Sequence, residues 1–279
     1  MEISDIKKFI DGIDLLNNER EIVTKFLDYG INVLQCESGS FFAVNENKKT
    51  LTFDIVRGAS SEELSGISFK YTGIVGWCAQ TKKDILVKDV NNNPVFTKKI
   101  DYATQYKTKS VIAITIGYGR DLFGIVEFIN PKNKNFFDET DFDLIKLISY
   151  CVSHKIYIIR MENSIFEVNK RLDSAINNLS GGFIGIDNNG IIVFLNPRAR
   201  EILDIKGDYV GKMYHDLDDY LYKIKELLGD SKNGKFVKRG ELVCKINSVE
   251  KKIGFSTISL RAIDGTILGS AIIFQDISG

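Results

Sequence analysis

The feature that most constrains this chain is the stretch between Pro131 and Gly181, which contains neither proline nor glycine. Because those two residues most often interrupt helices, a single helix can run through the whole interval. Asp138 with Asp141 suits its amino-terminal cap, and Gly181-Gly182 suits its end. A helix of roughly 40 residues is about 60 Å long at 1.5 Å per residue, too long for an ordinary core helix. We therefore expect a helix that projects from one domain toward another.

Apolar or small residues recur along this interval at spacings of three and four, which is typical of a coiled-coil seam. The members of the predicted seam are Leu144, Leu147, Cys151, His154, Ile158, Met161, Ile165, Val168, Leu172, Ala175 and Leu179. Exposed in a single helix, side chains such as Ile165 or Leu172 would forgo about 1.5 to 3 kcal/mol each relative to full burial. The pattern predicts a homodimer, with parallel helices favoured because like domains then meet at both ends. The alternative is a helix that folds back within the monomer.

A second apolar stripe runs beside the first half of the seam only, and consists of Ile145, Ile148, Val152, Ile156 and Ile159. We expect the first half of the helix to bury this stripe on its own domain and to offer the seam to a partner. The polar or small seam members His154 and Ala175 are the positions at which we expect the balance between two signalling states to be set.

The length and charge of the chain agree with two soluble domains. A single core rarely grows beyond roughly 250 residues, and this chain has 279, with 44% apolar residues. Acidic and basic residues number 37 each, which disfavours nucleic acid and anionic membrane surfaces as partners. No stretch approaches the roughly 18 apolar residues of a membrane span. We expect a cytoplasmic protein with a first domain at 1–137, a connecting helix at 138–180 and a second domain at 181–279.

Both domains show an α+β pattern with an antiparallel sheet and flanking helices. In the first, amphipathic helical spacing over 6–36 precedes a hairpin at 40–56, a short helix at 74–80 and two strands at 111–116 and 123–129. In the second, a hairpin turns at Asn188-Asn189-Gly190, a helix runs from Leu217 to Gly229, and three strands turn near 247–248 and 264–265. We expect the second sheet to have five strands.

The stretch Gly73–Thr81, followed by Ile85–Val90, Pro94 and Phe96, resembles the central segment of GAF domains. Asn130, Phe137 and Asp141 are similar to three members of the five-residue signature of cyclic-nucleotide-binding GAF domains. Pro131 and Phe142 stand where that signature has lysine and glutamate. The alternative interpretation of the three matches is structural: a strand end, a core aromatic and a helix cap.

The segments Gly181–Asp187 and Gly190–Ile192, then Asn196–Ala199 and Phe274–Ser278, resemble a PAS domain. Asp276, Ile277 and Ser278 are similar to the Asp-Ile-Thr triplet with which that family passes to its output helix, and serine keeps the hydroxyl. The two resemblances imply a sensory module that binds a small ligand or partner and transmits the change through a paired helix. They also imply an output domain in a longer protein of which this chain is a fragment. That domain would be a histidine kinase, a nucleotide cyclase or a transcription-activating ATPase, and we favour the histidine kinase.

The same resemblances suggest where a small-molecule ligand, whose identity and cofactor class the sequence leaves unknown, would bind. In the first domain the candidates are Phe42, Trp77, Phe96, Ile100 and Thr108. In the second domain they are Phe194, Asn196, Tyr220 and Phe255. Each of them has an alternative interpretation as a core residue, and Asn196 as the support of a local turn.

No catalytic constellation stands out in the sequence. The chain has two histidines, His154 in the predicted seam and His215 in a loop, so a serine or cysteine nucleophile has no evident base. The four cysteines are far apart and include no Cys-x-x-Cys pair, so we expect no metal site. We also expect no disulfide in a cytoplasmic protein. We therefore predict that the chain is not an enzyme. The alternatives are a GAF-fold methionine sulfoxide reductase, which would use Cys36 and Cys78, and a ligand-free dimerisation scaffold.

Overall fold

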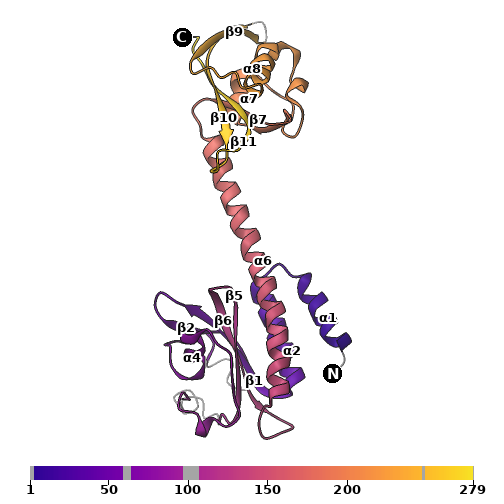
Figure 1. Cartoon of the computed structure of the whole chain (residues 1–279), viewed down its shortest axis with the longest axis vertical. Coiled ribbons are helices and arrows are strands. Elements are labelled where there is room, and N and C mark those ends of the chain that lie inside the picture. The colour runs from indigo at the N-terminus through magenta and orange to yellow at the C-terminus, as the bar shows by residue number, and fades with distance from the viewer. Residues whose placement is uncertain (1–2, 59–63, 97–106, 247–248, 279) are drawn as a thin grey trace. The chain divides into compact units, whose positions relative to one another are not determined.

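The computed structural model describes residues 3–58, 64–96, 107–246 and 249–278. It divides into two compact units, Met1–Ile165 and Phe166–Gly279, with the division inside one long helix (Figure 1). Each unit has an antiparallel sheet with helices, so the predicted α+β class is confirmed. Among the described residues, no helix combines the length and the apolar character needed to cross a membrane.

The first unit begins with two helices and continues with a sheet that carries one short helix. The elements are α1 (Ile3–Asp14), α2 (Glu19–Leu34), β1 (Cys36–Asn45), β2 (Thr50–Arg57), β3 (Ser68–Lys70), α4 (Gly73–Thr81), β4 (Ile85–Val87), η1 (Val90–Asn92), β5 (Val111–Tyr118) and β6 (Asp121–Pro131). The described strands form a six-stranded sheet in the order β3-β2-β1-β6-β5-β4. The predicted hairpin, short helix and strand pair are all present, and β3 and β4 are strands that apolar alternation over three residues is too short to reveal.

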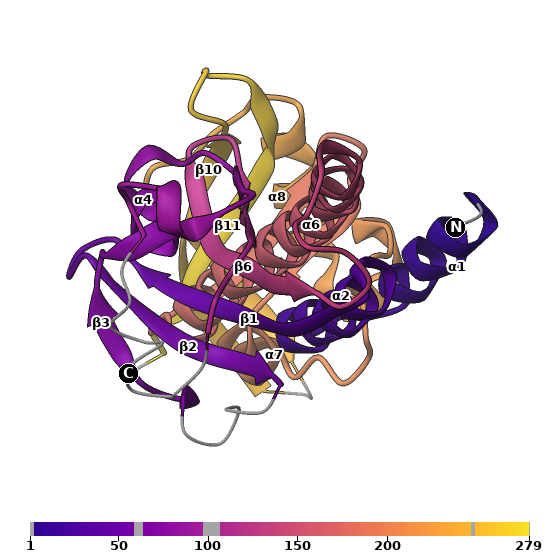
Figure 2. The same ribbon diagram turned by 90° about the horizontal axis from the view of Figure 1, so that it is seen from below.

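The sheet of the first unit has an apolar layer on each face. Helices α1, α2 and the first half of α6 (Glu139–Asn177) cover one face, with Phe26 and Phe128 among the fully buried side chains. Helix α4 covers the other face, as Figure 2 shows, and its layer includes Phe42 and Leu51. Alternate residues of β1, β5 and β6 supply both layers because successive side chains of a strand point to opposite faces.

Helix α6 has 39 residues, and its start is fixed by reciprocal side-chain caps. The backbone N–H of Asp138 donates to Asp141 Oδ2 (2.9 Å), and the N–H of Asp141 donates to Asp138 Oδ1 (3.0 Å). Lys134 Nζ binds both carboxylates, and its hydrogen bond to Asp138, with backbone donors, lowers the pKa of that carboxyl group. These bonds satisfy N–H groups that have no partner within the helix, as the sequence predicts for this pair.

The second unit contains the end of α6 and a five-stranded sheet among the described residues. Its further elements are β7 (Gly182–Asp187), β8 (Ile192–Leu195), α7 (Pro197–Leu203), η2 (Tyr214–Asp216), η3 (Asp219–Leu221), α8 (Tyr222–Lys232), β9 (Gly240–Ile246), β10 (Val249–Arg261) and β11 (Ile267–Asp276). The strand order is β8-β7-β11-β10-β9, so the predicted count of five is confirmed. Helices α7 and α8 and the inner face of the sheet share one apolar core.

One predicted helix of the second unit is wrong at both ends. The sequence predicts a helix from Leu217 to Gly229, whereas α8 begins at Tyr222 and continues to Lys232. Leu217 and Leu221 are buried in the irregular η2–η3 segment, so their spacing reflects contact with the core rather than helical periodicity. Gly229 lies inside α8, where a Cβ atom would come 3.0 Å from Tyr214 Oη. This glycine therefore permits close packing and does not end the helix.

Candidate functional site

Three of the candidate ligand residues of the first unit lie in the apolar layer beneath α4. Phe42 is fully buried there, and Trp77 and Phe96 are partly buried against the same cluster. Thr108 is partly buried just before β5, and Ile100 lies outside the described residues. The structure thus brings Phe42, Trp77 and Phe96 together on the face of the sheet that carries α4.

Packing accounts for Phe42 without a ligand. Its ring centroid lies 4.5 Å from that of Phe53 and 6.0 Å from that of Phe69, and the last two rings are 5.5 Å apart. Such tilted and edge-on pairs are the usual geometry of aromatic cores. The partly exposed side chains of Trp77 and Phe96 are therefore the members of this group with surface left to offer a ligand.

The three residues that resemble the cyclic-nucleotide signature have structural roles here. Asn130, at a left-handed φ of 56°, accepts hydrogen bonds at Oδ1 from Lys109 N (2.7 Å) and Ser110 N (3.4 Å). Its Nδ2 donates to Glu37 Oε2 (2.9 Å) and to Lys107 O (2.9 Å). Phe137 is 1% exposed in the core, and Asp141 caps α6. The structural interpretation of these matches is therefore supported.

The two cysteines that a redox enzyme would use lie in separate apolar cores. Cys36 belongs to the layer under α1, α2 and α6, and Cys78 to the layer under α4, so the two are in different cores. Both are fully buried, and desolvation raises the pKa of the Cys36 thiol to about 12 and that of Cys78 also well above its usual value. A thiol in such surroundings stays protonated and reacts slowly.

The candidate ligand residues of the second unit are divided by the sheet. Tyr220 and Phe255 pack against the inner core, and the Tyr220 hydroxyl donates toward the carbonyls of Leu203 (3.2 Å) and Asp204 (3.1 Å). Burial, aided by nearby acidic groups, raises the pKa of Tyr220 to about 12. Phe194 instead pairs edge-on with Phe183, with ring centroids 6.2 Å apart. These four predicted residues do not form one cluster.

Asn196 is completely buried and makes four hydrogen bonds within the unit. Its Oδ1 accepts from Phe183 N (2.8 Å) and Ala199 N (2.9 Å), and its Nδ2 donates to Ile176 O (3.1 Å) and Gly181 O (3.0 Å). One side chain thereby joins the last turn of α6, the first strand β7 and the first turn of α7. Its amide group is committed to this joint, which extends the predicted support of a local turn.

The predicted output triplet is fastened to the neighbouring strand β10. Asp276 Oδ1 accepts from Ser278 N (3.1 Å) and Ser278 Oγ (2.6 Å), and these bonds lower the pKa of the Asp276 carboxyl group. The Ser278 hydroxyl also accepts from Lys252 N (2.9 Å), and Ile277 N donates to Lys252 O (2.8 Å). The triplet therefore continues the pairing of β11 with β10 in a defined geometry, with Ile277 40% exposed.

One apolar stripe of α6 is buried, and the other, the seam, is largely exposed. All five members of the second stripe, Ile145 to Ile159, are at most 4% exposed on the sheet of the first unit. The seam is open: Leu147 is 60% exposed, Ile165 62% and Leu172 54%. The other seam members are exposed or partly buried, namely Leu144, Cys151, His154, Ile158, Met161, Val168, Ala175 and Leu179. Every side chain from Met161 to Ala175 is exposed, so this part of the helix packs against nothing in the described chain.

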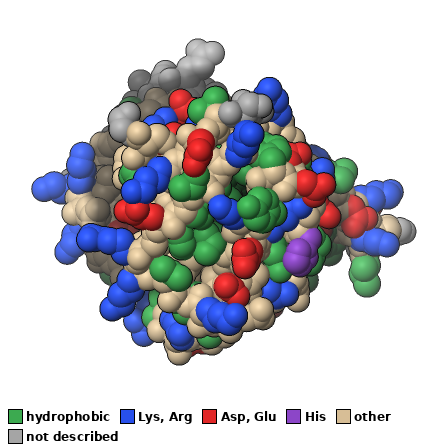
Figure 3. All heavy atoms as spheres, turned by 90° about the horizontal axis from the view of Figure 1, so that it is seen from above, with side chains coloured by type: hydrophobic (Ala, Val, Ile, Leu, Met, Phe, Trp, Pro, Cys, Tyr) green, Lys and Arg blue, Asp and Glu red, His purple; other side chains and the backbone are tan. Residues whose placement is uncertain are grey.

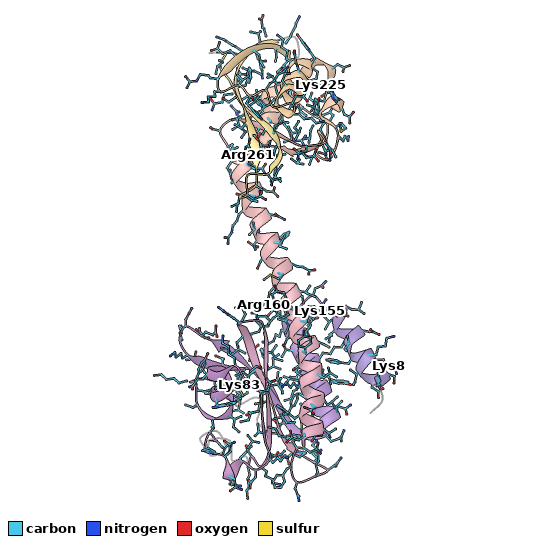
Figure 4. The ribbon with its side chains drawn as sticks, in the orientation of Figure 1. Lys8, Lys83, Lys155, Arg160, Lys225 and Arg261 are labelled. Atoms are coloured by element: carbon cyan, nitrogen blue, oxygen red, sulfur yellow. The ribbon has the colours of Figure 1, made fainter. Side chains whose placement is uncertain are left out.

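One group of contacts that sequence reasoning missed surrounds α6 just before this exposed part. We call it the collar; it comprises Ser153, His154, Lys155, Tyr157 and Arg160 of α6 with their partners. Lys155 Nζ donates to Asp14 O (2.8 Å), and Arg160 binds Glu19 through two hydrogen bonds of 2.9 and 2.7 Å. Figure 4 labels both basic side chains on α6. Their partners are about 140 positions away in sequence, so no local pattern announces them.

The collar also receives the turn between β5 and β6. Gly117 N donates to Ser153 Oγ (3.2 Å), and the Tyr118 ring stacks on Tyr157 with centroids 4.1 Å apart and planes at 19°. The Arg160 guanidinium lies 4.2 Å from the Phe123 ring centroid, a cation–π contact that adds to its ion pair. The collar is thus the place where helices and sheet of the first unit all hold α6.

A groove of about 640 Å³ lies between α1 and α2, beside the stacked rings of Phe9 and Tyr29. Its rim carries Lys8, Lys25, Asp5 and Asp28, and Lys25 already donates to Gly12 O (3.0 Å).

Among the described residues, no three histidine, cysteine or acidic side chains lie close enough to hold a metal ion. On the face drawn in Figure 3, acidic and basic side chains are mixed with apolar ones.

Comparison with known proteins identifies the first unit. The GAF domain family matches residues 15–154, half of the chain. Over 107 residues the chain is 36% identical to the cGMP-specific 3',5'-cyclic phosphodiesterases of Drosophila melanogaster and Drosophila pseudoobscura, and the match covers 37% of the chain. It covers 9% and 10% of those enzymes, so the chain corresponds to a small part of the curated relatives it matches.

Two solved structures share the fold at low sequence identity. The Escherichia coli DhaR(N)-DhaL complex matches 98% of this chain and 90% of that chain with a TM-score of 0.51 and 13% identity. The GAF domain of a phosphoenolpyruvate-protein phosphotransferase from Coxiella burnetii matches 57% of this chain and 94% of that chain, with a TM-score of 0.50 and 13% identity. These likenesses concern the fold alone. The match of the family over residues 15–154 establishes that the chain belongs to the GAF domain family, a family of sensory and regulatory domains.

Proposed function

We propose that this chain is a sensory module in which a small ligand or partner at the α4 face of the GAF domain alters a dimer formed through α6. The second unit is a PAS domain that relays the change to an output domain, such as a histidine kinase, in the full-length protein. The observation that carries the proposal is the open seam of α6 beside a fully buried second stripe. From Met161 to Ala175 the helix packs against no other described part of the chain, so we propose that a second copy of α6 covers the seam.

The energetics favour pairing of the seam. Burial of Ile165, Val168 and Leu172, each more than half exposed, contributes about 1.5 to 3 kcal/mol per side chain if complete. The exposed stretch also has the length and spacing that two helices need to interlock. Parallel pairing places like domains side by side, which suits a device that passes a movement along the helix.

The PAS assignment rests on the order of features in the second unit. The unit has one five-stranded antiparallel sheet. Three features follow one another in its sequence: the hairpin β7–β8, the Asn196 cap of α7 and the triplet Asp276–Ser278. This is the order that the sequence resemblance implies. Because the triplet is fastened to β10, a distortion of the sheet reaches the end of the chain.

The ligand of the GAF domain is proposed to be a small molecule that contacts Trp77 and Phe96. The Drosophila relatives carry cGMP in their names, but Asn130 of this chain is engaged with Lys107, Lys109 and Ser110. We therefore base no cyclic-nucleotide assignment on that similarity. Native mass spectrometry of the purified chain distinguishes a receptor, which retains a small molecule, from a dimerisation scaffold with a filled core.

The redox alternative receives no support from the thiols, since Cys36 and Cys78 are buried on opposite faces of the sheet. The proposal therefore assigns no enzymatic activity to this chain.

The dimer is tested by sedimentation equilibrium of the wild type and of Leu172→Glu. Loss of two buried leucines removes about 3 to 6 kcal/mol, so the dissociation constant should rise by about 10² to 10⁴. The matched control is Phe166→Glu, which replaces a 65% exposed apolar residue outside the seam by the same charge and should leave association unchanged. A monomeric wild type, or equal association of wild type and Leu172→Glu, would refute the proposal.

A further inference from the structure

The turn between β5 and β6 touches both layers of the GAF domain. It lies at the end of the two strands that separate the α4 face from the α6 face. Gly117 marks a register shift between the strands, and a Cβ atom there would lie 2.4 Å from Asp121 O. Glycine is therefore required for the tight geometry that directs the Gly117 N–H toward α6.

On the α6 side, the turn is held at the collar. The Gly117 N–H donates to Ser153 Oγ, whose residue is 5% exposed, and Tyr118 stacks on Tyr157 with His154 5.7 Å away. A displacement of the turn must therefore break or carry along contacts to α6. These contacts lie just before the exposed part of that helix.

On the α4 side, the turn is held by Lys82, the residue that ends α4 in a left-handed conformation with φ of 54°. Lys82 Nζ donates to Arg120 O (2.7 Å) and forms an ion pair with Glu46 Oε1 (2.7 Å). The Lys82 N–H also donates to Cys78 O (2.8 Å), and Thr81 Oγ1 donates to Trp77 O (2.9 Å). The last turn of α4, with Trp77, is thus linked to the tip of the β5–β6 turn.

We propose that Lys82 and the β5–β6 turn couple the position of α4 to the hold of the collar on α6. This regulatory link rests on the proposed sensory function, because it gives ligand contact at Trp77 a route to α6 around the end of strands β5 and β6. When α4 shifts, Lys82 displaces Arg120, and the adjacent Gly117 and Tyr118 loosen or tighten Ser153 and Tyr157. All of these contacts lie within the first unit of one chain.

Amide hydrogen exchange of Gly117 measures the hold of the turn on α6. In Lys82→Met we expect exchange at Gly117 and at the α6 amides 153–160 to be about fivefold faster, since a charge-assisted bond to the turn is lost while the aliphatic stem stays. Lys83→Met is the matched control, because the neighbouring lysine, labelled in Figure 4, is also exposed but its side chain forms no hydrogen bond or ion pair with the described residues. Lys82→Arg should restore slow exchange. Equal exchange in the Lys82→Met and Lys83→Met variants would overturn the proposal.

Coupling must also run in the reverse direction, because linkage between two sites is reciprocal. Trp77 is the single tryptophan of the chain, so its fluorescence reports on α4. Ser153→Ala and Tyr157→Leu should each change acrylamide quenching of Trp77 by about 1.5-fold or more through the collar. Unchanged quenching in both variants would contradict the link.

Sedimentation of the same samples keeps the two proposals separate. A monomeric wild type with the expected exchange and quenching would refute the dimer and retain the link. A dimer without these changes would refute the link and retain the dimer.

Discussion

The seam runs through both halves of α6, yet the two halves are stabilised in different ways. Up to Arg160, one stripe is buried on the sheet, and the collar adds the Arg160–Glu19 ion pair and a stacked tyrosine pair. From Met161 to Ala175 only the open seam remains, and every side chain is exposed. Short helices are marginal in water without tertiary packing. The first half is therefore part of a domain core, whereas the second half has no packing partner among the described residues, and the proposed dimer would supply one.

The largest difference between the two halves is expected when the same charge is introduced into each of them. Ile148→Asp puts an unpaired carboxylate at a fully buried site, and we expect the first unit to lose more than about 4 kcal/mol or to fail to fold. Val168→Asp, at a 55% exposed seam site, should change the stability of the dilute monomer by no more than about 0.5 kcal/mol. Urea unfolding followed by circular dichroism measures both. Similar losses would mean that the two halves are equally buried.

The next largest effect concerns the far end of α6. Asn196→Ala removes four buried hydrogen bonds and leaves the N–H groups of Phe183 and Ala199 without that partner, so the second unit should lose about 2 to 4 kcal/mol. Asn178→Ala is the control, because Asn178 bonds only to Ser174 at an exposed site. Calorimetric unfolding distinguishes the two. A loss below about 1 kcal/mol would show that Asn196 does not act as a joint.

A smaller effect separates two arginines on the same helix. Arg160→Met removes the paired bonds to Glu19 and the cation–π contact with Phe123, and should cost about 1 kcal/mol because the site is partly exposed. Arg171→Met changes an exposed arginine of the second half and should stay within about 0.5 kcal/mol. Chemical denaturation of the first unit gives both numbers. Equal losses of stability in Arg160→Met and Arg171→Met would show that the collar does not stabilise the first half of α6.

The smallest change leaves the fold intact and concerns thiol labelling. Burial that raises the pKa of Cys36 from 9.0 to about 12 reduces its thiolate at pH 8 about a thousandfold, so Cys36 should label only after unfolding. Partly exposed Cys151 should label first, and faster on dilution if the seam pairs. Because the folded pKa is raised, the contribution of Cys36 to stability is complete below pH 9 and is lost between about pH 9 and pH 12. Rapid labelling of Cys36 at pH 8 would contradict its burial.

Much of the fold followed from local signals. Period-two and helical spacing indicated the hairpins, the paired strands and α6, and the Asp138–Asp141 caps placed its start. The three-residue strands β3 and β4 escaped because three residues carry too little alternation. The predicted start of α8 is wrong because Leu217 and Leu221, which suggested helical spacing, are buried in the core from an irregular segment.

The sites were less accessible to sequence reasoning. Aromatic candidates such as Phe42 and Trp77 were found by resemblance, and packing distinguished the buried Phe42 from the partly exposed Trp77. Asn196 was predicted as a ligand candidate or turn support, and its four bonds required knowledge of how α6, β7 and α7 meet. The hydrogen bond of Lys82 to Arg120 O could not be predicted from the sequence, since the two residues are 38 positions apart.

The amino-acid pattern alone predicts a long uninterrupted helix with two apolar stripes in its first half, because helical periodicity is a local property of the chain. The point at which α6 leaves the first domain, and the side chains that bind it there, are visible only in the folded protein. Both depend on contacts such as Arg160 with Glu19, between residues 141 positions apart, which no local pattern encodes. They arise only when the sheet brings distant segments within bonding distance.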